Sequence, residues 1–554
     1  MEGTQILSAG AGFIAWDWLA IALYFGILLV IVWWAVAQKQ KSSADYFLAG
    51  RNMGWFVIGA SLFASNIGSE HIVGLSGSGA QSGVAMAHYE LHAWLLLVLG
   101  WVFVPFYARS GVFTMPEFLE KRYSSSSRWF LSVVSLVAYV FTKVSVALYA
   151  GGIVFKALFP DDFIAGIDNF WLGAIGLVVL TGLYTVLGGL RAVVFTDALQ
   201  AIVLIIGSAT VGIVGLYKLG GWSNFREICG SEYFNLWKPY NDPNFPWPGM
   251  LLCAPIVGLW YWCTDQYIVQ RTLSARNETQ ARRGTIFAAY LKLTPVFIFI
   301  IPGMMAFALA KTGKLSLAGG DQAFPALVKA LLPAGLRGLV VAGLLAALMS
   351  SLSSVFNSCS TLFTIDIYEK IRPNASEKHL VLVGRIATAA VVILGILWIP
   401  FMKYISVGLY RYLQSVQAYI APPISAVFLL GLFSKRINAK GSICGLVSGF
   451  ILGMSRLVAE LFKSNLQDNR ILYSFANINF LYFSLLLFLV SVGVVVIVSL
   501  MTKPPSLEKI QGLTYATATT NEKAMSRASW NKTDVIHTVI VLSIILMVYF
   551  YFTG

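Results

Sequence analysis

Residues 62–72, with the sequence LFASNIGSEHI, place polar groups in the middle of an apolar run that extends over residues 55–83. Lipid offers no hydrogen bonds, so such a segment must face protein or a water-filled cavity. Gly68 and its polar neighbours predict a helix that is interrupted near the middle of the membrane, with backbone carbonyl groups free to hold a cation. Interrupted helices of this kind mark the binding sites of secondary transporters, and an ionisable side chain at this depth indicates a functional site.

A second group of candidate ligands lies in residues 345–354, LAALMSSLSS. Ala347, Ser350 and Ser351 are spaced i, i+3 and i+4, so they share one face of a helix. Small residues on such a face suit close packing between helices, and the serines also offer hydroxyl oxygens. With the carbonyl groups freed at the interrupted helix, the two serines would form a neutral site made of oxygens. Hard cations prefer oxygen ligands, so this set fits a monovalent cation.

The composition places the chain among membrane proteins. Hydrophobic residues make up 58% of the 554 residues and charged residues 12%, and the mean hydropathy is +0.75, whereas a soluble protein is about 25% charged. The net charge of +14 does not indicate nucleic-acid binding, because the basic residues lie in short loops between apolar runs. No nucleophile–base pair, metal-binding cysteine pattern or phosphate loop appears in the sequence. We therefore expect an all-α polytopic membrane protein that is not an enzyme.

Apolar runs predict about fourteen transmembrane helices, since a helix of ~20 apolar residues spans a bilayer. Their ranges are 13–37, 55–83, 84–108, 128–157, 168–190, 194–217, 248–271, 284–311, 337–366, 380–402, 405–433, 440–463, 477–501 and 535–552. Every second loop is basic, which places those loops in the cytoplasm and both termini outside a plasma or inner membrane. Arg122, Arg128 and Arg271 are counted among these loop residues, and 502–534 is interpreted as a cytoplasmic linker.

A second span, 246–271, is also interrupted, by Pro255, Gly258, Asp265 and Gln266. The two interrupted spans are five spans apart, so each opens a half of five helices, and the second half is inverted. That arrangement indicates an inverted-repeat transporter. The predicted division is a peripheral helix in 1–45, two repeat halves in 46–240 and 241–434, and C-terminal peripheral helices in 435–554.

Several longer motifs follow one another in register between about residues 45 and 503. They include GASLFASNIGSEH, YTVLGGLRAVVFTDALQ, AALMSSLSSVFNSCSTLFTIDIY and SVQAYIAPPISAVFLL. These motifs resemble the sodium/glucose cotransporter family of solute:sodium symporters. The resemblance implies a LeuT-type inverted-repeat fold and sodium-coupled symport of a neutral sugar by alternating access. The short loop at 312–336 lacks the large insertion of animal members and looks bacterial.

The resemblance also implies two sets of site residues. The sodium ion would be held by the backbone carbonyl groups of Ala64, Ile67 and Ala347 and the hydroxyl groups of Ser350 and Ser351. The sugar would be held by the side chains of Asn66, His71, Glu90, Tyr261, Trp262, Lys292 and Gln414. Their chemistry suits a sugar, because the set contains hydrogen-bond donors, acceptors and aromatic faces. Lys292 would donate to the sugar and Glu90 would accept from it, or Lys292 would be a purely structural counter-ion.

Three questions stay open at the level of the sequence. Asp197 and Ser353 could hold a second sodium ion, or Asp197 could be a structural partner of Arg191. The substrate could be a glucose- or galactose-like sugar or myo-inositol, because Glu70 follows the inositol branch of the family. A sugar-gated sodium sensor or leak is the rival to a symporter. The expected partners are sodium, a neutral sugar or polyol, and the lipid bilayer, without nucleic acid and with no oligomer implied.

Overall fold

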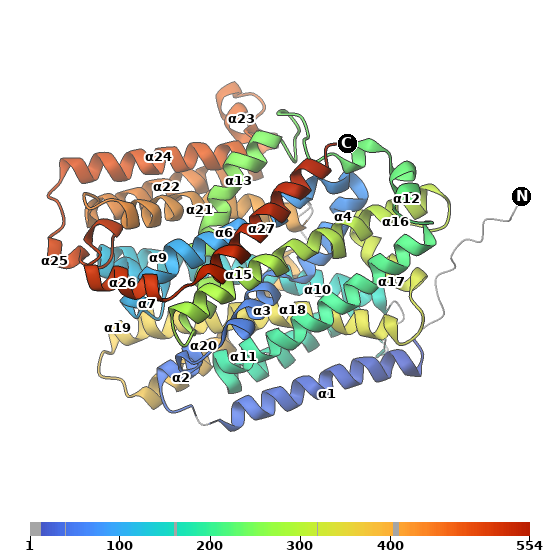
Figure 1. Cartoon of the computed structure of the whole chain (residues 1–554), viewed down its shortest axis with the longest axis horizontal. Helices are drawn as coiled ribbons and strands as arrows, with labels where there is room; N and C mark the ends of the chain where they lie inside the picture. The colour runs from blue at the N-terminus through green and yellow to red at the C-terminus, as the bar shows by residue number, and fades with distance from the viewer. Residues whose placement is uncertain (1–12, 39, 160–162, 165, 318, 403–408) are drawn as a thin grey trace, which may run out of the picture.

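The computed structural model describes residues 13–38, 40–159, 163–164, 166–317, 319–402 and 409–554. These residues form helices, joined by short loops that contribute only isolated β-bridges (Figure 1). Eleven of the described helices are long and apolar enough to cross a membrane. The chain is therefore an all-helical, multi-pass membrane protein, as its composition predicts.

The count of fourteen crossings stays a prediction. Helix α11 (Asn169–Lys218) alone has 50 residues and is non-helical at Gly189, where φ is 55°. At 1.5 Å per residue it is about 75 Å long, more than twice the hydrocarbon core of a bilayer. A count of continuous helices consequently falls below a count of crossings.

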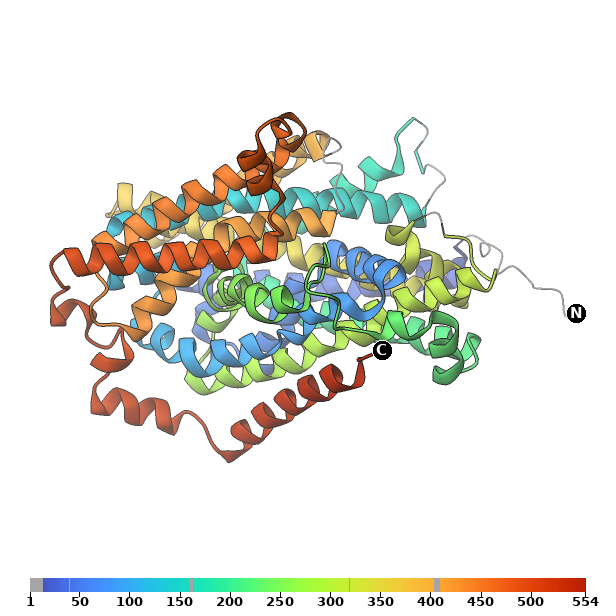
Figure 2. The same ribbon diagram turned by 90° about the horizontal axis from the view of Figure 1, so that it is seen from above.

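The core of the bundle is α18 (Leu336–Thr361), whose residues are almost all buried. It packs against α11, α1 (Ala15–Ala37) and α20 (Glu377–Met402). Other long helices include α9 (Ser125–Ala138), α10 (Ser145–Leu158), α15 (Glu278–Pro295), α16 (Ile301–Lys311), α21 (Leu409–Phe433), α22 (Ala439–Leu461), α24 (Phe480–Met501) and α27 (Lys532–Tyr551). Helices α1 and α27 lie at the outside of the bundle (Figures 1 and 2), so only one face of each is covered by protein.

Both predicted interruptions are present. Helix α3 (Trp55–Asn66) ends before Ile67 and Gly68, which have extended backbone, and α4 (Ser69–Ser82) follows. In the later span, α13 (Ala254–Leu259) and the π-helix η7 (Trp260–Thr264) are separated from α14 (Gln266–Leu273) by Asp265, where ψ is 124°. Each break joins two short helices near the centre of the bundle, and these breaks position the candidate site.

Three arginines that the charge pattern assigns to loops are instead buried. Arg122 ends α8 (Met115–Arg122), is 1% exposed, and donates to the carbonyl groups of Gly431, Ser434 and Ile437. Arg128 pairs with the buried Asp366 at 2.7 Å, and Arg271 lies inside α14 at 0% exposure. The prediction is wrong for these residues because a guanidinium has five donors, which can satisfy helix ends and buried carboxylates.

The segment predicted as a linker, residues 502–534, folds back onto the bundle. It contains α25 (Leu507–Ile510) and α26 (Thr520–Ala528). The Ser526 hydroxyl donates to Glu278 of α15 at 2.8 Å, and Arg283 pairs with Asp534 at 2.8 Å. The linker is therefore docked against the start of α15, and α27 continues from it along the outside of the bundle (Figure 2).

Candidate functional site

The break between α3 and α4 leaves carbonyl groups without their helical donors. The donor for the Ala64 carbonyl would be the Gly68 N–H, which points instead to His71 Nδ1 at 3.4 Å. The donor for the Ile67 carbonyl would be the His71 N–H, which bonds to the Gly68 carbonyl at 3.1 Å. Both Ala64 and Ile67 are buried, at 1% and 0% exposure. These two carbonyl groups thus lack the N–H donors that a continuous helix would give them, and a sodium ion held by them stays a prediction.

Helix α18 brings its serines to this break. The Ser351 hydroxyl donates to the Ser65 carbonyl at 3.4 Å, and the Ser65 hydroxyl lies 2.8 Å from that of Ser354. Ser350, Ser351 and Ala347 are all less than 5% exposed. Helix α18 thus brings the Ser351 hydroxyl to the carbonyl group that follows Ala64, in a buried region rich in oxygen atoms.

Asp197 lies beside this cluster on α11. Its carboxylate accepts hydrogen bonds from Ser350 at 2.6 Å and from Ser61 at 2.6 Å, and Arg271 Nη2 is 3.8 Å away. The suggested partnership with Arg191 is wrong, because Arg191 bonds to Gln38 and to the Ala49 carbonyl. The basic group beside this carboxylate is instead Arg271, from α14.

Ser353, the other candidate for a second sodium site, directs its hydroxyl elsewhere. It donates to the Ser350 carbonyl at 3.0 Å, within α18. Asp197 in turn already has a cationic neighbour in Arg271. A second sodium ion bound by Asp197 and Ser353 therefore stays a prediction.

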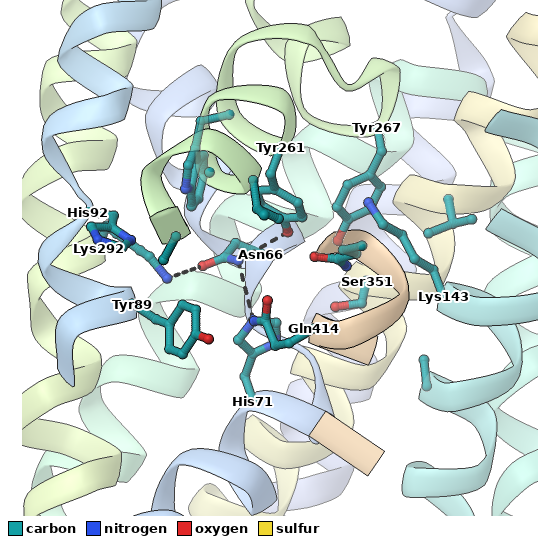
Figure 3. A pocket seen from close by; sticks show the side chains of 17 residues that line it. Asn66, His71, Tyr89, His92, Lys143, Tyr261, Tyr267, Lys292, Ser351 and Gln414 are labelled. Atoms are coloured by element: carbon teal, nitrogen blue, oxygen red, sulfur yellow. Dashed lines mark hydrogen bonds between the residues drawn. The ribbon is translucent and has the colours of Figure 1, made fainter. Parts of the chain in front are cut away.

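Asn66 is the hub of the candidate sugar site (Figure 3). Lys292 Nζ donates to Asn66 Oδ1 at 2.9 Å, while Asn66 Nδ2 donates to the Tyr261 hydroxyl at 3.1 Å and lies 3.4 Å from His71 Nε2. Lys292 Nζ also pairs with Glu90 Oε2 at 2.7 Å. The structure thus brings five of the predicted sugar residues together, from α3, α4, α5 (Ala87–Leu91), η7 and α15.

A cavity lies beside this network. Six of the seven predicted sugar residues line it: Asn66, His71, Tyr261, Trp262, Lys292 and Gln414. Glu90 does not line it; it is 0% exposed and lies behind Lys292. Its second oxygen, Oε1, has no hydrogen-bond partner among the residues that the structure describes. Glu90 therefore acts first on Lys292 and on the charge of the cavity.

Sequence reasoning missed several residues that line the same cavity, namely Tyr89, His92, Lys143, Tyr267 and Gln417. Gln417 could have been found from the sequence, because it lies three residues after Gln414 on one helix face. Lys143 could also have been found from the sequence, since a lysine inside an apolar span indicates a functional site. Tyr89 and Tyr267 could not have been found in this way, because tyrosines are common in such spans.

The electrostatics of the cavity favour an uncharged ligand. Each lysine in its wall has a carboxylate partner: Lys292 pairs with Glu90, and Lys143 pairs with Asp265, both at 2.7 Å. The amides of Asn66 and Gln414 can donate and accept hydrogen bonds, and aromatic rings cover apolar surface. The wall of the cavity thus offers hydrogen-bond donors and acceptors beside aromatic faces, with both of its lysines paired.

The family model described as the sodium:solute symporter family matches residues 46–449. The chain belongs to this family. It is 41% identical over 539 residues to the sodium/myo-inositol cotransporter 2 of Homo sapiens, covering 90% of this chain and 79% of the relative. It is 40% identical over 527 residues to the sodium/glucose cotransporter 1 of Ovis aries, covering 87% and 78%.

The fold agrees with this membership. A solved structure of a Na+-coupled sialic acid symporter superposes with a TM-score of 0.74 at 24% identity, covering 89% of this chain and 99% of the other. The chain thus has a LeuT-type fold with broken helices. It is a sodium-coupled symporter, not an enzyme, and sodium is its co-transported ion.

Proposed function

We propose that this symporter imports a neutral sugar or polyol together with sodium across a plasma or bacterial inner membrane, with both termini on the outer side. A glucose- or galactose-like sugar is the first candidate and myo-inositol the alternative. The observation that carries the proposal is the hydrogen-bonded set Asn66–Lys292–Glu90, which presents amide and ammonium groups to the cavity with no net charge. Relatives named for glucose and for myo-inositol agree with a hydroxyl-rich solute.

The proposed sugar contacts divide by chemistry. Asn66, Gln414 and His71 would exchange hydrogen bonds with hydroxyl groups, and Lys292 would donate with Glu90 as its counter-ion. Tyr261 and Trp262 would cover the apolar face of the ring. Tyr261 also accepts a hydrogen bond from Asn66 at 3.1 Å, so it would close the site over the bound ring.

Uptake into proteoliposomes with competing solutes tests the choice of substrate. We expect unlabelled glucose, galactose and myo-inositol to compete against radiolabelled sugar, with one of them effective at the lowest concentration. Sialic acid and amino acids should not compete, because a cavity with balanced charges does not compensate an ionised solute. Preferential competition by a charged solute would contradict the proposal.

The proposed sodium site consists of the carbonyl groups of Ala64, Ile67 and Ala347 and the hydroxyl groups of Ser350 and Ser351. Ser351→Ala removes one oxygen ligand and little volume. We expect it to raise the sodium concentration for half-maximal uptake about tenfold, because one contact comparable in strength to a hydrogen bond is lost. Sodium titration of uptake at saturating sugar measures this change.

Ser360→Ala is the matched control, because Ser360 is equally buried on α18 but bonds to the Gly384 carbonyl at 2.6 Å, away from the break. Its sodium half-saturation should equal that of the wild type. An unchanged value in Ser351→Ala would place the ion elsewhere. A second ion at Asp197 and Ser353 is tested separately, by comparing the sodium-to-sugar ratio from reversal potentials in the wild type and in Asp197→Asn.

A further inference from the structure

A histidine in the cavity wall, His92, has one ring nitrogen that takes no part in the packing of the helices. His92 directly follows α5, lines the cavity and is 4% exposed. Figure 3 shows its imidazole on the same side of the cavity as Lys292 and opposite Lys143. The ring of Tyr89 packs against the imidazole edge-on, with the two centroids 6.2 Å apart. The imidazole is therefore held in a fixed orientation on the Lys292 side of the cavity.

The Nε2 side of the ring has a structural role. Nε2 lies 3.0 Å from the carbonyl oxygen of Met250, in the π-helix η6 (Gly249–Cys253). This carbonyl group lacks a helical donor, because the Ala254 N–H bonds to the carbonyl group before it and Pro255 has no N–H. A carbonyl oxygen can only accept, so Nε2 carries the hydrogen of this bond. His92 thus satisfies a carbonyl group that the neighbouring proline leaves without a donor.

The other ring nitrogen, Nδ1, has no hydrogen-bond partner among the residues that the structure describes. With the hydrogen on Nε2, Nδ1 of the neutral ring is an acceptor. The ring is neutral because no carboxylate in the described part of the chain pairs with it, and Lys292 already places a cation in the same wall. A second buried cation without a partner would be costly. His92 therefore brings an unused acceptor to the wall of the cavity.

A sugar hydroxyl on this side of the cavity needs such an acceptor. A hydroxyl group both donates and accepts, whereas Lys292 can only donate. The resemblance gives the accepting role to Glu90, but Glu90 lies behind Lys292 and does not line the cavity. Asn66 Oδ1 already accepts from Lys292 at 2.9 Å. Nδ1 of His92 is thus an uncommitted acceptor on the side where the lysine donates.

We propose that His92 Nδ1 accepts a hydrogen bond from a hydroxyl group of the transported solute. The proposal rests on the proposed function and adds a specificity-determining residue to it. A hydroxyl group that accepts from Lys292 Nζ donates to His92, so the site requires a true hydroxyl group at that position of the ring. A solute with a hydrogen atom or an ether oxygen there leaves Nδ1 buried and unpaired, and it binds more weakly.

Two substitutions separate contact with the solute from the structural role of the ring. The amide of His92→Gln reaches the position of Nε2, so it keeps a donor for the Met250 carbonyl but has no acceptor at the position of Nδ1. The amide of His92→Asn does the reverse, since its oxygen takes the position of Nδ1 and the donor for Met250 is lost. Sugar binding and protein stability should therefore respond to different variants.

We expect His92→Gln to keep the thermal stability of the wild type and to raise the sugar concentration for half-maximal uptake about tenfold. His92→Asn should lower the thermal stability and raise that concentration less than about threefold, because the solute keeps an acceptor. Sodium-dependent uptake of radiolabelled glucose, galactose or myo-inositol into proteoliposomes measures the first quantity. Thermal unfolding of the purified protein measures the second.

Monodeoxy analogues of the transported solute identify the hydroxyl group that His92 contacts. Each analogue competes with the parent solute for uptake by the wild type and by His92→Gln. One analogue should lose about tenfold more against the wild type than against the variant, because only the wild type has an acceptor to leave unpaired. The other analogues should lose the same factor against both proteins.

His88→Gln is the matched control. His88 lies on α5, is buried, and bonds through Nε2 to the Leu236 carbonyl at 2.9 Å, but it does not line the cavity. The substitution keeps a donor for that carbonyl group, as His92→Gln does for its own. Its sugar half-saturation should equal that of the wild type.

Two results would overturn the contact between His92 and the solute. One is an unchanged sugar half-saturation in a stable His92→Gln variant. The other is a tenfold rise in His92→Asn, since His92 would then act only through Met250. If His92→Gln is not recovered from the membrane, His92→Asn decides alone by the same criterion. Failure of the proposed function is distinguishable, because then the wild type itself would show no sodium-dependent uptake of a sugar or polyol.

Discussion

Glu90→Ala should reduce sodium-dependent sugar uptake at least about a hundredfold. Glu90 Oε2 pairs with Lys292 Nζ at 2.7 Å in a site where Lys292 is 4% exposed. Removing one partner of a buried ion pair costs about 3–5 kcal/mol, because the other charge stays buried and uncompensated. Lys292 also holds Asn66 Oδ1 at 2.9 Å, so the loss extends to the hub of the sugar site. Initial uptake rates, normalised to the amount of reconstituted protein, measure the effect.

Glu232→Ala is the control for this variant. Glu232 also pairs with a lysine, Lys238, at 2.5 Å, but its side chain is 77% exposed, in the short 3-10 helix η5 (Ser231–Phe234). Exposed pairs contribute about 0–1 kcal/mol, so uptake should be close to that of the wild type. A normal sugar half-saturation in Glu90→Ala would show that the Lys292–Glu90 pair does not belong to the sugar site.

Arg271→Met should abolish uptake and lower the thermal stability of the purified protein. Arg271 is fully buried, lies 3.8 Å from Asp197, and donates to Ser61 at 3.3 Å. Without it, Asp197 is a carboxylate in the core with only hydroxyl partners, at a cost of about 3–5 kcal/mol. Because Asp197 also accepts from Ser350, this change reaches the candidate sodium ligands.

Adding Asp197→Asn to Arg271→Met tests this explanation. The second substitution removes the uncompensated negative charge of Asp197, so it should restore much of the lost stability without restoring uptake. Arg276→Met is the surface control, since Arg276 is exposed and its guanidinium donates to the Asn52 side chain at 2.8 Å. Equal stability of the single and double variants would mean that Arg271 does not compensate Asp197.

The position of the site could be predicted from the sequence because its signal is local. Polar residues within an apolar run locate the break at Ile67 and Gly68, and a helical spacing of small residues locates the face of Ser350 and Ser351. The seven sugar residues come from the resemblance to a family, and six of them line the cavity. The break and the serine face are thus visible in a few consecutive residues, whereas the sugar residues come from motifs spread along the chain.

Apart from Lys292 and Glu90, the pairing of buried charges could not be predicted in the same way. Arg271 pairs with Asp197, and Lys143 pairs with Asp265 across 122 residues of sequence. A sequence shows that such residues are present, but their partners depend on how distant helices pack. The charge pattern even favoured loops for Arg122 and Arg271, since a basic residue near the end of an apolar run has the same appearance whether it is exposed or buried.

Uphill accumulation in proteoliposomes tests the central claim most directly. With an inward sodium gradient and radiolabelled glucose, galactose or myo-inositol, we predict a transient internal concentration several times the external one. The accumulation should disappear when sodium is equal on both sides or is replaced by potassium. A solute that only equilibrates, or a sodium flux that responds to sugar without any accumulation, would contradict the account and identify a sugar-gated sensor or leak.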